Sequence, residues 1–143
     1  MEHTYLAQLG PMLVLTISIV GSAIGSCIAG AACHAAMTKT EEGHGKLIGM
    51  SSAPASQCIY GFILMILLND SIQSGKITEI AGIYIGILAG IGFFISSYLQ
   101  SKIILTGIQA TVTRPALFGK CFAAVGILES FALFVFVFTL LII

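Results

Sequence analysis

Charged residues are scarce in this chain: Asp, Glu, Lys and Arg together make up 8% of its 143 residues. A soluble domain carries roughly 25% charged residues, because its surface must be wetted by water. The hydrophobic share is 57%, and the mean hydropathy is +1.05. So few charges cannot cover a water-exposed globule, and we therefore expect an integral membrane protein.

Several motifs are also missing. The basic residues are scattered and the net charge is +0, which argues against nucleic-acid binding. The four cysteines lie in apolar stretches without a CxxC pair, so we expect small hydrophobic residues rather than disulfides or metal ligands. There is no GxxxxGK[ST] nucleotide motif, and the chain is not expected to be an enzyme. The first ten residues contain no Lys or Arg, unlike a signal peptide, so we expect the first apolar run to be retained.

Four apolar runs are separated by short polar connectors, and they cover residues 11–36, 47–68, 80–108 and 119–143. Each run reaches the ~20 residues that are needed to cross ~30 Å of hydrocarbon. Backbone groups in lipid must be satisfied within the segment, so the runs are expected to be helices. The expected fold is a single all-α membrane domain over residues 1–143, with one helical hairpin at 11–68 and a second at 80–143.

The connectors differ in positive charge. The first and third carry Lys39, Lys46 and Arg114, and Lys120 follows closely, whereas the middle connector carries Lys76 alone. Cytoplasmic loops are enriched in Lys and Arg. The pattern therefore places both hairpin loops in the cytoplasm and both termini outside.

Small residues recur at four-residue steps in the first and third runs. They are Gly21, Gly25 and Ala29 in the first run, and Gly82, Gly86 and Gly90 in the third. Such spacing forms a smooth stripe on which another helix packs closely. A single stripe indicates ordinary helix pairing, but two stripes predict an inner layer of thin helices around a tight axis.

Glu129 is the only charged residue between residues 121 and 143. A carboxylate at this depth in a membrane is unfavourable, and it marks a functional-site hypothesis for an ion or a proton. A shift of 72 residues aligns Gln57 with Glu129, and each lies ten residues after its run begins, about 15 Å from the cytoplasmic end at 1.5 Å per residue. Gln100, nine residues before Gln109, is expected at a similar depth.

These polar residues predict an oxygen cage for a small cation. Glu129 supplies the charge, Gln57 and Gln100 supply amide carbonyl oxygens, and Ser56 adds a hydroxyl. Alternatively, the same polar groups only hydrogen-bond across helices, which contributes ~0.6–2 kcal/mol each. A proton site would leave two glutamines surplus, so the set favours Na⁺ over H⁺.

Three further residues bear on this cage. Pro54 has no backbone N–H, so we expect a kink that frees the carbonyl of Met50, and kinked helices commonly expose carbonyls to coupling ions. Tyr60 lies one turn from Gln57, and its hydroxyl is expected to hold the Glu129 carboxylate. Lys102 is expected to snorkel toward the interface; if it reached Glu129 instead, it would neutralise the acid.

With these residues in hand, the chain resembles the rotor-ring proteolipid, designated K or c, of V-type and bacterial or archaeal V/A-type ATPases. The resemblance rests on PASQCIYGF (54–62), AAVGILESFAL (123–133) and Gln100 in YLQSKIILTGIQ (98–109). It implies that the ion is held at the positions of the Ala53 carbonyl, Ser56, Gln57, Gln100 and Glu129, as in sodium-type members, and that Tyr60 bonds to the acid.

The resemblance also implies the partners. Identical subunits would form a ring in membrane lipid, and the ring would turn against a stator subunit whose essential arginine displaces the ion. Central-stalk subunits would contact the cytoplasmic loops, and a prokaryotic plasma membrane is the expected location. The transported ion would be Na⁺ or H⁺, with no organic cofactor. The alternatives are a small proton-coupled secondary transporter that uses Glu129, and a structural membrane spacer.

Overall fold

The computed structural model describes residues 2–143, and it describes side chains from Tyr5 onward. Its helices are α1 (Glu2–Met37), α2 (His44–Ser51), α3 (Ser56–Gln73), α4 (Glu79–Thr113) and α5 (Phe118–Leu140), with 3-10 turns η1 (Ala53–Ala55) and η2 (Pro115–Leu117). No strand occurs among residues 2–143. Four segments are long and apolar enough to cross a membrane: Tyr5–Met37, His44–Gln73, Glu79–Thr113 and Pro115–Leu140. The predicted all-α fold is confirmed.

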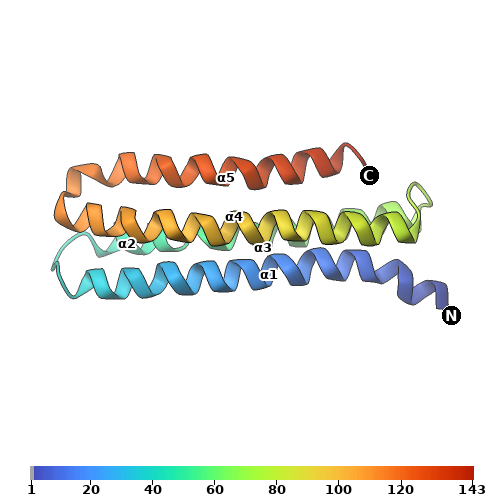
Figure 1. Ribbon diagram of the computed structural model, residues 1–143, viewed down its shortest axis with the longest axis horizontal. Helices are drawn as coiled ribbons and strands as arrows, with labels where there is room; N and C mark the ends of the chain where they lie inside the picture. Colours follow the sequence, from blue (N-terminus) through green and yellow to red (C-terminus); the bar gives the residue numbers. More distant parts are fainter. Residues whose placement is uncertain (1) are drawn as a thin grey trace.

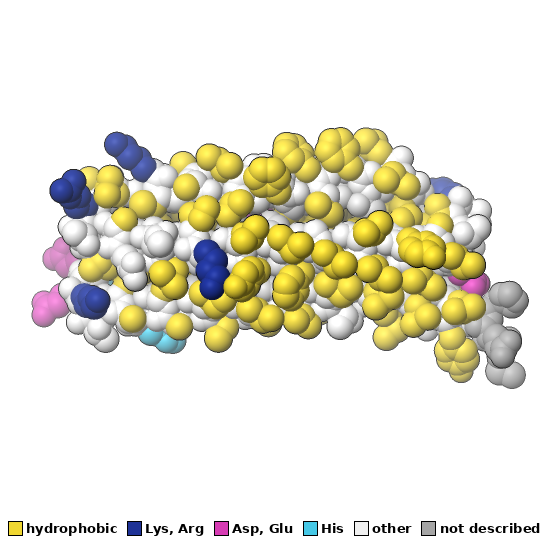
Figure 2. Space-filling view, viewed as in Figure 1, with side chains coloured by type: hydrophobic (Ala, Val, Ile, Leu, Met, Phe, Trp, Pro, Cys, Tyr) yellow, Lys and Arg dark blue, Asp and Glu magenta, His cyan; other side chains and the backbone are white. Residues whose placement is uncertain are grey.

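The helices lie side by side along one long axis (Figure 1). Helix α4 is central, since it packs against α1, α3 and α5. Both chain ends lie at the end of the bundle where α3 turns into α4, and the other two connectors lie at the opposite end (Figure 1). Apolar side chains cover the middle of the bundle, and most charged side chains gather at its two ends (Figure 2). This distribution suits a bundle that spans a membrane.

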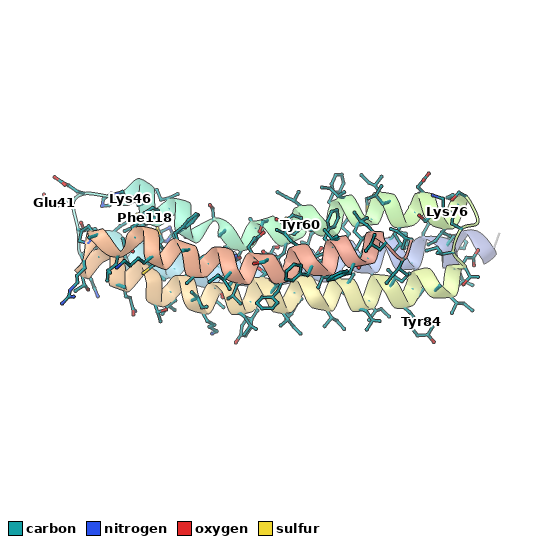
Figure 3. The ribbon with its side chains drawn as sticks, turned by 90° about the horizontal axis from the view of Figure 1, so that it is seen from above. Glu41, Lys46, Tyr60, Lys76, Tyr84 and Phe118 are labelled. Carbon is teal, nitrogen blue, oxygen red and sulfur yellow. The ribbon has the colours of Figure 1, made fainter. Side chains whose placement is uncertain are left out.

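The basic connectors share one end of the bundle. Lys46, at the start of α2, lies with its ammonium group 5.7 Å from the centre of the Phe118 ring, at the start of α5. Figure 3 shows both residues at one end, and Lys76 at the other. The charge difference seen in the sequence is therefore a difference between the two ends of the folded molecule.

Helices α1 and α4 extend beyond the predicted runs. Helix α1 begins at Glu2 instead of residue 11, so Pro11 lies inside it. A proline removes one hydrogen bond from its helix. Such a proline is tolerated in a membrane helix because neighbouring helices can satisfy the freed backbone group. Helix α4 continues to Thr113, five residues past the expected end at 108. It ends there because the residue before a proline is held extended, and Arg114, before Pro115, has φ −141° and ψ 93°.

Helix α3 also extends past its predicted end, so the connector between α3 and α4 is shorter than predicted. Helix α3 runs to Gln73 and closes at Gly75, whose φ of 75° is the left-handed conformation that glycine adopts without a steric penalty. The N–H of Gly75 donates to the carbonyl of Ile72, and the N–H of Lys76 donates to that of Ser71, both at 3.0 Å. This is the Schellman arrangement, which satisfies the last carbonyls of a helix.

The second membrane segment is broken at its middle. Helix α2 ends at Ser51, η1 holds Pro54, and α3 starts at Ser56. The N–H of Ser52 donates to the carbonyl of Ile48 at 3.1 Å, and Pro54 has no N–H to donate to the carbonyl of Met50, so the helix is interrupted where the sequence predicted a kink. At the break, the carbonyls of Ala53 and Pro54 accept hydrogen bonds from the hydroxyls of Ser56 and Ser97.

Glycines bring α1 and α4 into backbone contact. A methyl group at Gly86 would overlap the carbonyl of Gly10, and one at Gly21 would overlap the backbone of Phe94. At Gly25 it would meet Ser97 and Pro54. The stripes named from the sequence are Gly21, Gly25 and Ala29 in α1, and Gly82, Gly86 and Gly90 in α4. A methyl group at Gly90 would crowd Ile17 of α1, whereas at Gly82 it would meet the Ile72 side chain of α3.

Candidate functional site

Glu129 is half-buried on α5, and its side chain is held by α3 and α4. Its Oε2 atom accepts hydrogen bonds from the Nε2 atom of Gln57 at 3.0 Å and from the Nε2 atom of Gln100 at 2.8 Å. Its Oε1 atom accepts a hydrogen bond of 2.7 Å from the Tyr60 hydroxyl. Both carboxylate oxygens therefore have partners within the chain.

The two glutamines are fully buried and bonded to each other. The Nε2 atom of Gln57 also donates to Oε1 of Gln100 at 3.3 Å, and the Nε2 atom of Gln100 donates to the carbonyl of Val125 at 3.3 Å. Each amide group thus uses both of its N–H bonds. A buried amide without such partners would be strongly unfavourable, so this layer of the bundle is specified by its polar groups as well as by its packing.

The break at Pro54 brings two more oxygens to the same place. The Ser56 hydroxyl lies 2.9 Å from the carbonyl oxygen of Ala53 and 3.3 Å from Oε1 of Gln57. These contacts extend the hydrogen-bond network from Glu129 to the backbone at η1. The structure therefore brings together all five residues of the predicted cage, namely Ala53, Ser56, Gln57, Gln100 and Glu129.

Ser97 anchors the broken segment from behind, and sequence reasoning missed it. Its fully buried hydroxyl lies 3.0 Å from the carbonyl of Pro54 and 3.1 Å from the carbonyl of Gly21. It thus ties α4 to both α1 and η1. The available signal was its spacing: Ser97 precedes Gln100 by three residues, so both lie on one helix face.

Tyr60 closes the site on the α3 side. It lies near the middle of the bundle's length (Figure 3). Its ring packs against Phe93 and Phe136, with centroid distances of 6.2 Å and 5.8 Å. These neighbours restrict the ring, so the hydroxyl is directed at the carboxylate.

Lys102 lies away from the site. Its Nζ atom sits 4.9 Å from the centre of the Tyr98 ring, on the exposed side of α4. Within the part of the chain that the structure describes, no hydrogen bond or ion pair joins Lys102 to Glu129. The acid is therefore not neutralised by this lysine.

A half-buried acid, ringed by amides in the middle of a helical bundle, suits the capture of a small cation. The sequence model of one protein family, the ATP synthase C-subunit family, matches the chain twice, over residues 9–68 and 83–142. The chain belongs to this family. A search of curated proteins finds no match. The two family matches each take in one pair of membrane segments, so the chain contains the family's hairpin unit in duplicate.

Membership in this family settles the broad role of the chain. The ATP synthase C-subunit proteins are non-catalytic membrane proteins that form homo-oligomeric rings, pair with a stator subunit and carry H⁺ or Na⁺ without an organic cofactor. The chain is thus a multi-pass membrane protein and an ion-translocating rotor-ring subunit of a rotary ATPase or ATP synthase.

Proposed function

We propose that this rotor-ring protein carries Na⁺ as part of a V/A-type rotary ATPase, in which partner subunits hydrolyse ATP. The observation that supports this most directly is the pair of buried glutamines on one oxygen of Glu129, at 3.0 Å and 2.8 Å. A carboxylate that only exchanges protons needs no such pair. The duplicated hairpin with a single acid fits a V-type ring, and we take residues 11–68 and 80–143 as its two hairpins within one membrane domain.

The proposed ligands are five oxygens. They are the carboxylate of Glu129, the amide oxygens of Gln57 and Gln100, the Ser56 hydroxyl and the Ala53 carbonyl. Hard cations prefer oxygen ligands of this kind, and hydroxyl, amide and carbonyl oxygens add no charge. The amide nitrogens now face the carboxylate. A half-turn of each amide about its terminal bond would exchange nitrogen for oxygen and present the ligand to the ion.

The mechanism follows from charge. A ring can turn through lipid only when each Glu129 is neutralised, because a bare carboxylate is costly there. We propose that Na⁺ neutralises it and that Tyr60 holds the carboxylate in place. At the stator, an arginine would displace the ion. One acid per four membrane helices means few ions per turn, which suits pumping against a steep gradient.

We also propose an orientation. The connectors with Lys39, Lys46 and Arg114 would face the cytoplasm, where central-stalk subunits bind, and both termini would lie outside, since cytoplasmic loops favour Lys and Arg. A prokaryotic plasma membrane is the proposed location.

Labelling with a hydrophobic carbodiimide tests the ion. In the purified protein, we expect Glu129 alone to react, Na⁺ to slow the reaction and K⁺ to leave it unchanged. A Gln57→Leu/Gln100→Leu variant should still be labelled but should lose Na⁺ protection, and Glu129→Gln is the unreactive control. Equal rates with and without Na⁺ in the wild-type protein would exclude the sodium site and leave a proton carrier or a proton-coupled transporter. Absence of labelling would favour a spacer.

A further inference from the structure

One buried hydroxyl takes no part in the hydrogen bonds around Glu129. Ser22, in α1, is 5% exposed, and its Oγ atom has no hydrogen-bond partner. Among the residues that the structure describes, no other buried side-chain nitrogen or oxygen atom lacks a partner. A buried polar group without a partner is unfavourable, so the position of Ser22 requires an explanation.

Ser22 does not use the partner that its own helix offers. A serine in a helix can donate to the carbonyl three or four residues earlier. Ser18, one turn before Ser22, donates to the carbonyl of Leu15 at 2.8 Å, and Ser101 donates to that of Tyr98 at 2.7 Å. The Ser22 hydroxyl makes no such bond. Both its proton and its lone pairs are therefore available to another group.

Contacts on both sides of Ser22 set it level with Gln57. Helix α1 and the second membrane segment run in opposite directions (Figure 1). A methyl group added at Gly61 of α3 would overlap the Ser18 side chain, and one added at Gly25 of α1 would meet the proline of η1. Ser22 lies four residues after Ser18, and Gln57 lies four residues before Gly61. Because the rise per residue is the same in both helices, Ser22 and Gln57 lie at one level.

The two residues also share the interface between α1 and α3. Residues four apart lie on one helix face, so Gln57 lies on the face where Gly61 meets α1, and Ser22 lies on the face where Ser18 meets α3. Gln57 is fully buried, as Ser22 nearly is. The amide of Gln57 reaches across to α4 and α5, where its bonds are made. A buried hydroxyl without a partner thus stands opposite a ligand of the proposed sodium site.

The Gln57 amide needs new acceptors if its oxygen turns to an ion. Its Nε2 atom donates to Oε2 of Glu129 at 3.0 Å and to Oε1 of Gln100 at 3.3 Å. The proposed half-turn would move both N–H bonds away from these oxygens. The Ser56 hydroxyl, which lies 3.3 Å from Oε1 of Gln57, can accept one of them. The second N–H would remain without an acceptor in a buried layer, which is costly.

We propose that Ser22 is a positioning residue of the ion site. Its oxygen accepts the second N–H of Gln57 when the amide turns its own oxygen to Na⁺, and its proton then goes to the carbonyl of Ser18, one turn earlier. The inference rests on the proposed sodium site and deepens it. Ser22 would favour the ion-binding rotamer of Gln57 without touching the ion, so α1 would contribute to ion binding although it supplies no ligand.

A Ser22→Ala variant tests this role with two measurements. The change removes only the hydroxyl, so the midpoint of thermal unfolding in Na⁺-free detergent should stay the same or rise, because an unpartnered polar group is lost. The rate of carbodiimide labelling of Glu129 without Na⁺ should equal that of the wild-type protein. The Na⁺ concentration that halves this rate should rise about three- to thirtyfold, the range for one hydrogen bond between membrane helices.

Ser18→Ala is the matched control. It removes a buried hydroxyl from the same face of α1, one turn away, but this hydroxyl is bonded to the Leu15 carbonyl. The half-protecting Na⁺ concentration of this variant should be that of the wild-type protein.

Three results would overturn the role of Ser22 and leave the sodium site in place. They are a wild-type half-protecting concentration in Ser22→Ala, equal rises in Ser22→Ala and Ser18→Ala, and a lower unfolding midpoint of Ser22→Ala without Na⁺. The last would mean that the hydroxyl is already bonded within α1. Absence of Na⁺ protection in the wild-type protein would instead overturn the sodium site, and this inference with it.

Discussion

At the scale of single residues, Glu129 is tolerated because its neighbours compensate for its burial. An ionised side chain at the membrane centre costs about 3 kcal/mol on insertion scales. Hydrogen bonds to charged groups contribute about 1.5–3 kcal/mol each in proteins, and Glu129 accepts three. The bonds therefore offset much of the cost of burial, but the carboxylate keeps its charge, so a bound cation is still needed before the site faces lipid. The acid can stay in one position without a nearby cationic side chain, which leaves its charge available to a mobile ion.

Tyr60→Phe should weaken ion binding without unfolding the bundle. The change removes the 2.7 Å hydrogen bond to Oε1 of Glu129 and keeps the ring between Phe93 and Phe136. Hydrogen bonds between membrane helices contribute ~0.6–2 kcal/mol, so the Na⁺ concentration that halves carbodiimide labelling should rise about three- to thirtyfold. Tyr84→Phe, on the exposed face of α4, is the control. The same half-protecting concentration in both variants would mean that the hydroxyl does not support the ion.

At the scale of helices, the close packing of α1 against α4 and the break in the second membrane segment are linked. Glycines let α1 and α4 touch through their backbones, and this places Ser97 within reach of the Gly21 carbonyl. The same hydroxyl reaches the carbonyl of Pro54, where the second segment is broken. The position of η1, and with it the Ala53 carbonyl, therefore depends on how closely α1 and α4 approach.

Gly86→Ala should destabilise the bundle, because the new methyl group would overlap the Gly10 carbonyl. Overpacking of this kind costs about 1–3 kcal/mol, which exceeds the ~1 kcal/mol by which alanine favours a helix over glycine. Thermal unfolding in detergent should therefore show a lower midpoint. The matched control is Gly30→Ala in α1, where nothing lies within 4 Å of the added methyl group. A Gly86→Ala midpoint equal to that of the control would show that the backbone contact is not tight.

At the scale of the whole molecule, α5 presents an apolar surface that lipid or another chain must cover. It leaves large apolar side chains exposed, namely Ile127, Phe131, Phe134 and Phe138, at 52% to 65%. In water such a surface would aggregate, whereas lipid and neighbouring copies cover it in a ring. Because the first hairpin has Gln57 where the second has Glu129, each copy offers one acid at mid-membrane depth.

The assembled ring should show this ratio directly. Native mass spectrometry should give a mass that is a whole multiple of 15.0 kDa, and the maximum number of carbodiimide adducts should equal the number of chains. Glu129→Gln rings should take up none. A particle that remains a single chain, or one with two adducts per chain, would contradict a single-acid ring.

Much of this protein was predictable from its sequence. The low charge and the four apolar runs determine an all-α membrane fold, because lipid leaves backbone groups no partner outside the segment. The shared depth of Gln57, Gln100 and Glu129 was predictable too, because the rise per residue is constant along a helix. The helix ends were harder to predict. Helix α4 continues to Thr113, and it ends there because Pro115 restricts the backbone of Arg114.

Only the tertiary structure decided which way the side chains face. Depth follows from counting residues, but the direction of a side chain around its helix depends on how the helices pack. That packing brought Ser97 to the carbonyls of Gly21 and Pro54 and set Gly10 against Gly86. These contacts join residues that are far apart in the chain, so no local pattern in the sequence identifies the partners.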